Sequence, residues 1–124
     1  MRILVIGAGV TGCYIAARLQ QLGADITLLA RGERADRLAR EGLRLRDGIT
    51  GEERTVRLPI ACAPVDARFE LAMVCAQEVH RPGLLPLLEA LPGRPVLWYL
   101  GNTTRGYAEI AARLGRDRVL GGFP

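Results

Sequence analysis

The sequence Arg2-Ile3-Leu4-Val5-Ile6-Gly7-Ala8-Gly9-Val10-Thr11-Gly12 decides the fold. Its five mostly apolar residues run directly into the spacing Gly-x-Gly-x-x-Gly, and a helical pattern of apolar residues follows as far as Leu22. In this context the spacing marks the first strand–turn–helix unit of a dinucleotide-binding α/β domain. The alternative is a strand–turn–helix unit that merely tolerates glycine, and it leaves three correctly placed glycines without a purpose.

Each glycine of this motif has a separate expected role. Gly7 makes the tight turn after the strand, Gly9 lets the backbone approach a pyrophosphate, and Gly12 lets the helix pack against the strand. The start of the helix also offers unpaired backbone N–H groups, and the positive end of the helix dipole, to phosphates. The residues expected to offer these groups are Ala8, Gly9, Val10 and Thr11.

The composition of the chain limits its class and its partners. Its 124 residues, of which 49% are apolar, suffice for one globular domain. No apolar run approaches the ~20 residues that span a bilayer, so no membrane partner is expected. The net charge of +4 comes from scattered arginines, with few aromatic residues, so we expect no nucleic-acid partner. Cys13, Cys62 and Cys75 form no Cys-x-x-Cys pair, which favours a reducing cytoplasm and no metal site.

Two absences restrict the chemistry further. All 17 basic residues are arginine, and the chain contains neither lysine nor serine. A lysine general acid or a serine nucleophile therefore cannot come from these residues. The single histidine, His80, excludes a histidine-based metal cluster. It follows an expected central strand, where it is either a general acid or an exposed loop residue.

The remaining pattern predicts a doubly wound α/β domain with a mostly parallel sheet. Further strands are expected at residues 25–30, 71–76 and 95–100, with a last strand beginning at 118. Helices are expected at residues 10–22, 34–41, 82–91 and 107–114, and Pro86 should delay or kink the third of them. Alternation of apolar and polar residues over 43–46 and 53–58 predicts an antiparallel β-hairpin at one edge of the sheet.

The end of the strand at residues 25–30 bears on the choice of dinucleotide. In this fold an acidic residue there binds the ribose 2′-OH of NAD, whereas an arginine accommodates the 2′-phosphate of NADP. The chain reads Leu29-Ala30-Arg31-Gly32, and a guanidinium can give a phosphate two parallel hydrogen bonds. Arg31 therefore predicts NADP(H), with Arg34 as a second support. Glu33 is the competing residue, since a shift of the loop would present it to an NAD ribose.

The chain resembles the ketopantoate reductase (2-dehydropantoate 2-reductase) family. The resemblance covers essentially all 124 residues in order and spacing, and its motifs are Ile3–Gly9 with Gly12, Leu28–Glu33, Gly42–Leu45 and Arg118–Gly122. It implies an NADPH-dependent oxidoreductase of pantothenate biosynthesis, which transfers a hydride to a small 2-oxo acid. It also implies that this chain is only the N-terminal domain, because the family continues into a helical domain that supplies a catalytic lysine and a substrate-binding glutamate. The apolar ending Val119–Pro124 agrees with such a truncation.

Two departures from the family pattern concern the catalytic end of the cofactor site. Where the family usually has Val-Lys after a central strand, this chain has Ala76-Gln77. Where the family usually reads Leu-Gln-Asn-Gly, this chain reads Leu100-Gly101-Asn102-Thr103. The resemblance thus places Gln77 and Asn102 beside the nicotinamide and the substrate. Because glutamine carries no positive charge, the substrate stays open between ketopantoate and another small 2-oxo acid.

Two functions from different classes are compatible with the sequence. The first is the NADP(H)-binding domain of a ketopantoate-reductase-like enzyme, which alone binds cofactor without turnover because the lysine is missing. The second is a stand-alone nucleotide-sensing module, favoured by a complete strand–helix–strand unit in a short chain without a catalytic residue. An apolar face left by the missing domain is also expected to promote self-association.

Overall fold

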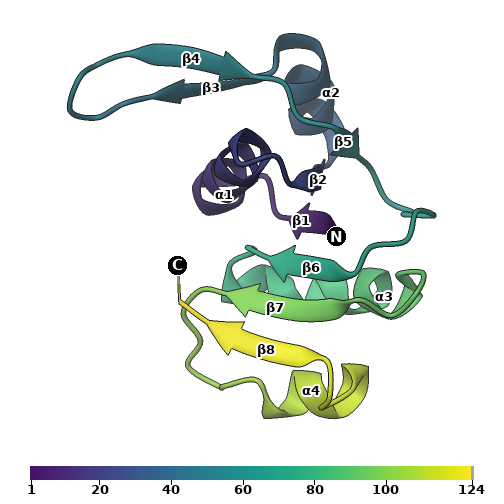
Figure 1. The fold of residues 1–124 in the computed structure, drawn as a ribbon. Coiled ribbons are helices and arrows are strands. Elements are labelled where there is room, and N and C mark those ends of the chain that lie inside the picture. The colour runs from purple at the N-terminus through teal and green to yellow at the C-terminus, as the bar shows by residue number, and fades with distance from the viewer. Residues whose placement is uncertain (124) are drawn as a thin grey trace.

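A six-stranded sheet forms the centre of the computed structural model, which describes residues 1–123 (Figure 1). The strand order is β5-β2-β1-β6-β7-β8, and every neighbouring pair is parallel. The strands are β1 (Arg2–Ile6), β2 (Asp25–Leu29), β5 (Ile60–Ala61), β6 (Leu71–Val74), β7 (Val96–Leu100) and β8 (Val119–Gly122). The predicted α/β fold is confirmed.

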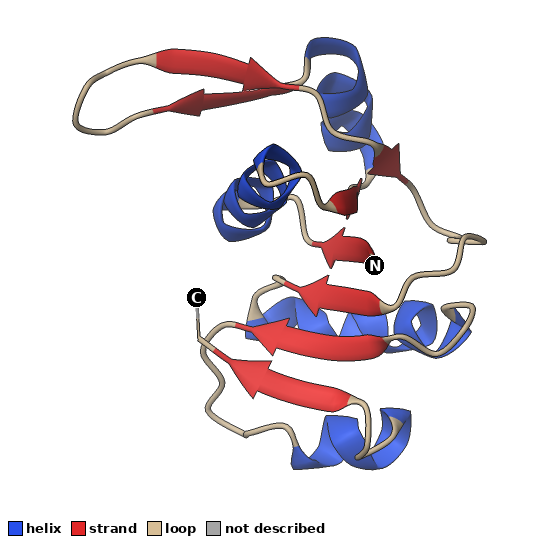
Figure 2. Cartoon of the chain, viewed as in Figure 1, coloured by secondary structure: helices blue, strands red, loops and turns tan. Residues whose placement is uncertain are grey.

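Helices cover the two faces of this sheet (Figure 2). They are α1 (Val10–Gln21), α2 (Gly32–Glu41), α3 (Arg81–Ala90) and α4 (Ala108–Leu114), with a short 3₁₀ helix, η1 (Glu78–His80), before α3. Alternate residues of β1 face opposite sides, as in any strand. Ile3 and Val5 pack with residues of α1 and α2, whereas Leu4 and Ile6 pack with residues of α3 and α4. The centre of the sheet, at β1, is therefore buried between two layers of helices.

The direction in which the chain adds strands reverses between β1 and β6. From β1 the chain passes through α1 to β2 on one side, and from β6 it passes through α3 to β7 on the other. Open parallel sheets bind ligands in the crevice that this reversal leaves at the carboxyl ends of the strands. A ligand site is therefore expected at the loops that follow β1, β2 and β6.

The predicted hairpin forms, but it lies apart from the main sheet. Strands β3 (Leu43–Arg46) and β4 (Glu53–Val56) pair antiparallel as a separate two-stranded sheet. The expected position at the edge of the main sheet is wrong, because after β4 the chain returns along β2. The N–H of Leu28 donates to the carbonyl of Pro59 at 2.9 Å, and β5 then occupies the edge. Two residues are too few for β5 to show a pattern in the sequence.

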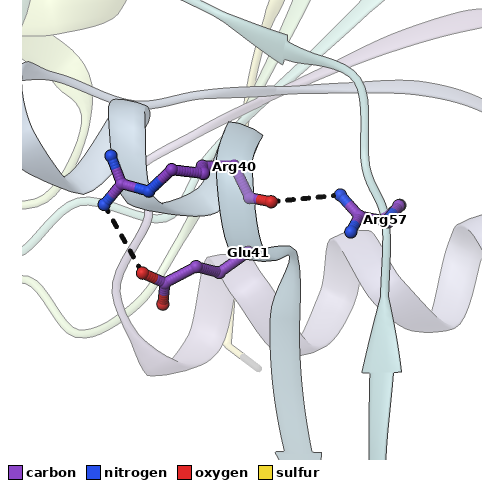
Figure 3. A network of polar contacts seen from close by, with 3 residues as sticks. All are labelled: Arg40, Glu41 and Arg57. Carbon is purple, nitrogen blue, oxygen red and sulfur yellow. Dashed lines mark hydrogen bonds and ion pairs between the residues drawn. The ribbon is translucent and has the colours of Figure 1, made fainter.

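An arginine fastens the exit of the hairpin to the end of α2 (Figure 3). Arg57 Nη1 donates to the carbonyl oxygen of Arg40 at 3.3 Å, and Arg40 Nη2 lies 3.4 Å from a carboxylate oxygen of Glu41. These side chains are exposed, so the ion pair adds little to stability. Most charged residues of α2 are exposed and form a solvated helix face.

Helix α3 runs through its internal proline. It begins at Arg81, one residue before the predicted start, and continues past Pro86 to Ala90. The expected delay of the helix is therefore wrong. Pro86 has no N–H to donate to the carbonyl of Pro82, so the helix continues without that one bond.

Part of the sheet remains exposed on the α1 side. Leu97 and Tyr99 of β7 are fully buried against α3 and α4, whereas the alternating Val96 and Trp98 are 38% and 37% exposed. Trp98 pairs in register with Leu120 of β8, which is 53% exposed. Val96, Trp98 and Leu120 thus form an exposed apolar patch on β7 and β8. The expected self-association through such a face stays a prediction.

We predict that Gly12→Ala strongly destabilises the domain, because a Cβ at position 12 would lie 1.9 Å from the carbonyl oxygen of Gly7. Gly9→Ala is the matched control, since Gly9 has a φ of −84° and its Cβ would meet nothing within 4 Å. Denaturant unfolding should show a loss of about 3 kcal/mol for Gly12→Ala and less than about 1 kcal/mol for Gly9→Ala. Equal stabilities of the two variants would contradict this packing.

Candidate functional site

A cavity of about 500 Å³ lies at the point where the sheet reverses direction. The loops after β1, β2, β5 and β6, the 3₁₀ helix η1 and the middle of α3 contribute its walls. The residues that line it include Gly7, Ala8, Gly9, Arg31, Arg34, Cys75, Ala76, Gln77 and His80. The crevice predicted from the topology is therefore present, and it brings the glycine-rich loop together with Arg31 and Gln77.

The glycine-rich loop has the geometry that its spacing predicts. Gly7 has a φ of +111°, and a Cβ there would approach the backbone of Cys75 to 3.1 Å. Gly12 lies so close to the carbonyl oxygen of Gly7 that no side chain larger than a hydrogen atom fits at position 12. The space beside Gly9 is open. A ligand can thus approach the backbone at Gly9 while Gly7 and Gly12 hold strand and helix together.

The first turn of α1 presents free donors to this space. The helix begins at Val10 after Gly9, and the first helical bond runs from Cys13 N–H to the carbonyl of Gly9 at 3.0 Å. In the described part of the chain, no side chain caps the N–H groups of this turn. These groups and the helix dipole favour a negatively charged ligand. Of the residues predicted to offer such groups, Gly9 and Val10 are exposed and Ala8 and Thr11 are half-buried.

Arg34 has a role that the sequence did not reveal. Its Nε donates to the carbonyl oxygen of Ala8 at 3.2 Å, and its Nη2 lies 3.4 Å from Cys13 Sγ. Helix α2 thereby holds the glycine-rich loop from the side. The contact with Ala8 spans 26 positions, so no local pattern could predict it. Arg31 is exposed and, within residues 1–123, its side chain makes no hydrogen bond or ion pair that would occupy it.

The other candidate residues occupy different positions around the crevice. Gln77 is exposed and lines the cavity, three residues after the end of β6. Asn102 is exposed on the loop after β7 and lies outside the cavity lining. His80 is exposed and lines the cavity, whereas Glu33, in the first turn of α2, does not. The structure therefore places Arg31, and not Glu33, in the crevice.

Two charged residues beside these loops escaped the sequence analysis. Glu78, next to Gln77, accepts hydrogen bonds from the hydroxyl of Thr103 at 2.7 Å and from the N–H of Thr104 at 3.1 Å. These bonds, that from Thr103 most strongly, lower the pKa of the Glu78 carboxyl. Arg81 is 3% exposed, and its Nε donates to the carbonyl of Ala76 at 3.3 Å. Only the adjacency of Glu78 to Gln77, and of Thr103 to Asn102, could have pointed to them.

The cysteines near the glycine-rich loop are not suited to nucleophilic chemistry. Burial, and to a smaller extent the nearby Cys13, raise the pKa of the Cys75 thiol to about 11. Cys13 is itself buried, and Cys62 is the exposed cysteine. Among the described residues, no group of three or more His, Cys, Asp or Glu could hold a metal ion. Nor does any helix of residues 1–123 have the length and apolarity to cross a membrane.

Comparison with known proteins identifies the family. The family described as ketopantoate reductase PanE/ApbA matches residues 3–123. The chain belongs to the ketopantoate reductase family. Among curated relatives, the uncharacterized oxidoreductase YkpB of Bacillus subtilis is 28% identical over 126 residues, which cover 99% of this chain and 40% of YkpB. The 2-dehydropantoate 2-reductase of Listeria monocytogenes is 25% identical and is likewise covered over 40% of its length.

Solved structures agree with this assignment. The 2-dehydropantoate 2-reductase of Geobacter metallireducens superimposes with a TM-score of 0.81 at 25% identity, over 98% of this chain and 40% of that one. A D-mandelate dehydrogenase in a ternary structure with NADH and anilino(oxo)acetate gives a TM-score of 0.85 at 20% identity, over 99% of this chain and 40% of its own. The latter similarity shows the fold. The chain spans about 40% of the length of these relatives.

We predict that thiol reagents distinguish the three cysteines of the native protein. At pH 7.5, Cys62 should react quickly with iodoacetamide, because it is exposed. Cys75 should stay unmodified, because a pKa of about 11 leaves almost no thiolate, and burial shields Cys13. Peptide mass spectrometry of the labelled chain measures this, and all three should react in denaturant. Rapid native labelling of Cys75 would contradict the packing of the glycine-rich loop against β6.

Proposed function

We propose that this chain is the NADP(H)-binding domain of a ketopantoate-reductase-like oxidoreductase. The observation that carries the proposal is the position of Arg31, exposed and unpaired at the end of β2, in the same crevice as the glycine-rich loop. Family membership supports the oxidoreductase class. The choice of NADP over NAD rests on the residues of this chain.

The charge of the crevice favours the phosphorylated ribose. Two cationic residues, Arg31 and Arg34, line the cavity, and its lining contains no aspartate or glutamate. A guanidinium can make two charge-assisted hydrogen bonds to a 2′-phosphate, whereas a ribose hydroxyl is better served by a carboxylate. Because Arg34 is already bonded to Ala8 and Cys13, Arg31 is the residue that would hold the phosphate.

The rest of the cofactor fits the same crevice. The pyrophosphate would lie over Gly9 at the start of α1, where Val10 and Thr11 offer N–H groups. The nicotinamide, which supplies a hydride when bound, would lie towards Gln77 and Asn102. Both residues have amide side chains, which donate and accept hydrogen bonds but hold no titratable proton. They can orient the ring and a substrate, while the proton for the product must come from elsewhere.

The proposed substrate of the whole protein is a small 2-oxo acid, acted on in pantothenate biosynthesis. One named relative is a 2-dehydropantoate 2-reductase, and a fold relative holds anilino(oxo)acetate beside NADH. Whether the substrate is ketopantoate depends on Gln77, which lacks the positive charge that would attract a carboxylate. Three free thiols fit the reducing cytoplasm, which we propose as the location. The comparisons give no support to a stand-alone sensing module.

We predict that the purified chain binds NADPH at least tenfold more tightly than NADH, a difference of about 1.4 kcal/mol. Calorimetric titration with each cofactor measures this. Arg31→Ala should abolish the preference, because it removes the group that would hold the 2′-phosphate. Arg37→Ala is the control, since Arg37 is an exposed arginine of α2 outside the crevice. Equal or stronger binding of NADH would contradict the assignment and favour Glu33 as the ribose ligand.

A second prediction concerns turnover. With ketopantoate present, this chain alone should bind NADPH without oxidising it, because it contains no lysine that could protonate the product. The absorbance of NADPH at saturating ketopantoate measures this. Steady oxidation above the rate without protein would show that these 124 residues hold a complete catalytic site.

A further inference from the structure

The two amide residues that we propose for the nicotinamide end are held only through their loops. Gln77 follows β6, and Asn102 follows the neighbouring β7. Neither side chain makes a hydrogen bond that the structure records for residues 1–123, and both are exposed. Their separation is therefore set by the backbone on either side of them. Any group that joins the two loops also sets the distance between the two amides.

Glu78 is such a group. It directly follows Gln77, and its carboxylate reaches across to the two residues that directly follow Asn102. Its Oε1 accepts from Thr103 Oγ1 at 2.7 Å and from Thr104 N–H at 3.1 Å, and its Oε2 accepts from Thr104 Oγ1 at 3.2 Å. Three donors converging on one carboxylate form a charge-assisted junction, which is stronger than one between neutral groups.

Arg81 and Tyr107 hold the backbone of the same two loops by hydrogen bonds to carbonyl groups. The Arg81 guanidinium bonds the carbonyl of Ala76 and lies 5.6 Å from the ring centre of Tyr99 and 5.7 Å from that of Tyr107. Tyr107 Oη donates to the carbonyl of Gly101 at 3.0 Å. The residues before Gln77 and before Asn102 are therefore held by a buried platform. Among the described residues, Glu78 is the side chain of one loop that bonds directly to the other loop.

We propose that Glu78 is a positioning residue, whose carboxylate joins the loop of Gln77 to the loop of Asn102 and thereby sets the nicotinamide end of the crevice. The inference rests on the proposed function, because it assigns Gln77 and Asn102 to that end. It goes beyond that function in naming a residue that is not itself part of the crevice lining. A loss of the junction should weaken binding of the nicotinamide and leave binding of the adenosine end intact.

Two ligands separate these effects. NADPH contains the nicotinamide, whereas 2′-phospho-ADP-ribose has the same phosphates and adenosine without it. Glu78→Gln keeps the size of the side chain but removes its negative charge, so the bonds from Thr103 and Thr104 lose their charge assistance. We expect calorimetry to show NADPH affinity lowered about threefold to tenfold, with that for 2′-phospho-ADP-ribose changed less than about twofold.

Further variants separate positioning from general loss of stability. Thr103→Val removes the shortest contact from the opposite loop and should give the same selective loss, while the double variant should lose little more than either single variant. Glu89→Gln is the matched control, because Glu89 is also a carboxylate held by a side chain, with its Oε1 2.6 Å from Arg113 Nε, and it lies on α3 away from both loops. It should change neither affinity.

The outcomes distinguish this inference from the proposed function. If Glu78→Gln lowers both affinities equally, or leaves NADPH affinity unchanged, the positioning role is wrong although the cofactor assignment stands. If the unmodified chain binds neither ligand, the proposed function fails and this inference fails with it. A selective loss of NADPH affinity in both single variants, but not in Glu89→Gln, is the result that the structure predicts.

Discussion

The contact between Gly7 and Gly12 is the constraint on which the rest of the structure depends. Without a side chain at position 12, the start of α1 can lie directly on the turn that ends β1. That approach places the N–H groups of the helix at the carboxyl end of the sheet, beside the loop after β6. The anion-binding end of the helix, the open space at Gly9 and the crevice at the reversal of strand order all follow from it.

The crevice has a distinct division of charge. Arg31 is free at the end of β2, whereas Arg34 on the following helix bonds the backbone of the glycine-rich loop. One arginine is thus available for a ligand, and the other holds the loop that the ligand would contact. At the opposite end, Glu78 and the buried Arg81 hold the loops that carry the uncharged Gln77 and Asn102. Charged groups therefore hold these two loops, while the residues that we propose for the nicotinamide end carry no charge.

The sequence predicted the elements that depend on local pattern. The glycine spacing predicted β1, the turn and α1, and continuous apolar runs predicted β2, β6 and β7, because such patterns reflect burial of neighbouring residues. The position of an element relative to the rest of the fold was harder to predict from the sequence. The hairpin was recognised from its alternation, but its separation from the main sheet depends on the bond between Leu28 and Pro59, which lies outside either strand of the hairpin.

The candidate site divides in the same way. Gly7, Gly9, Gly12 and Arg31 could be predicted, since each lies at a fixed offset from a strand end. The contacts of Arg34 with Ala8, and of Glu78 with Thr103, could not, because residues about 25 positions apart meet only once the sheet has assembled. Asn102 was predicted from the family pattern, and the structure places it on the loop beside the crevice instead of in its lining.

The central claim is that the helix start at Gly9, together with Arg31, forms the binding site of a phosphorylated nicotinamide nucleotide. Its most direct test is a titration of the ¹⁵N-labelled chain with NADP⁺, followed by two-dimensional NMR of backbone and side-chain N–H groups. The account predicts that the largest shifts map to residues 7–12 and to Arg31, with smaller shifts of the side-chain amides of Gln77 and Asn102. A second cavity, of about 550 Å³, is lined by residues of η1, α3, α4 and the loop between β7 and α4. Shifts centred on that cavity, or no shifts at saturating nucleotide, would contradict the account.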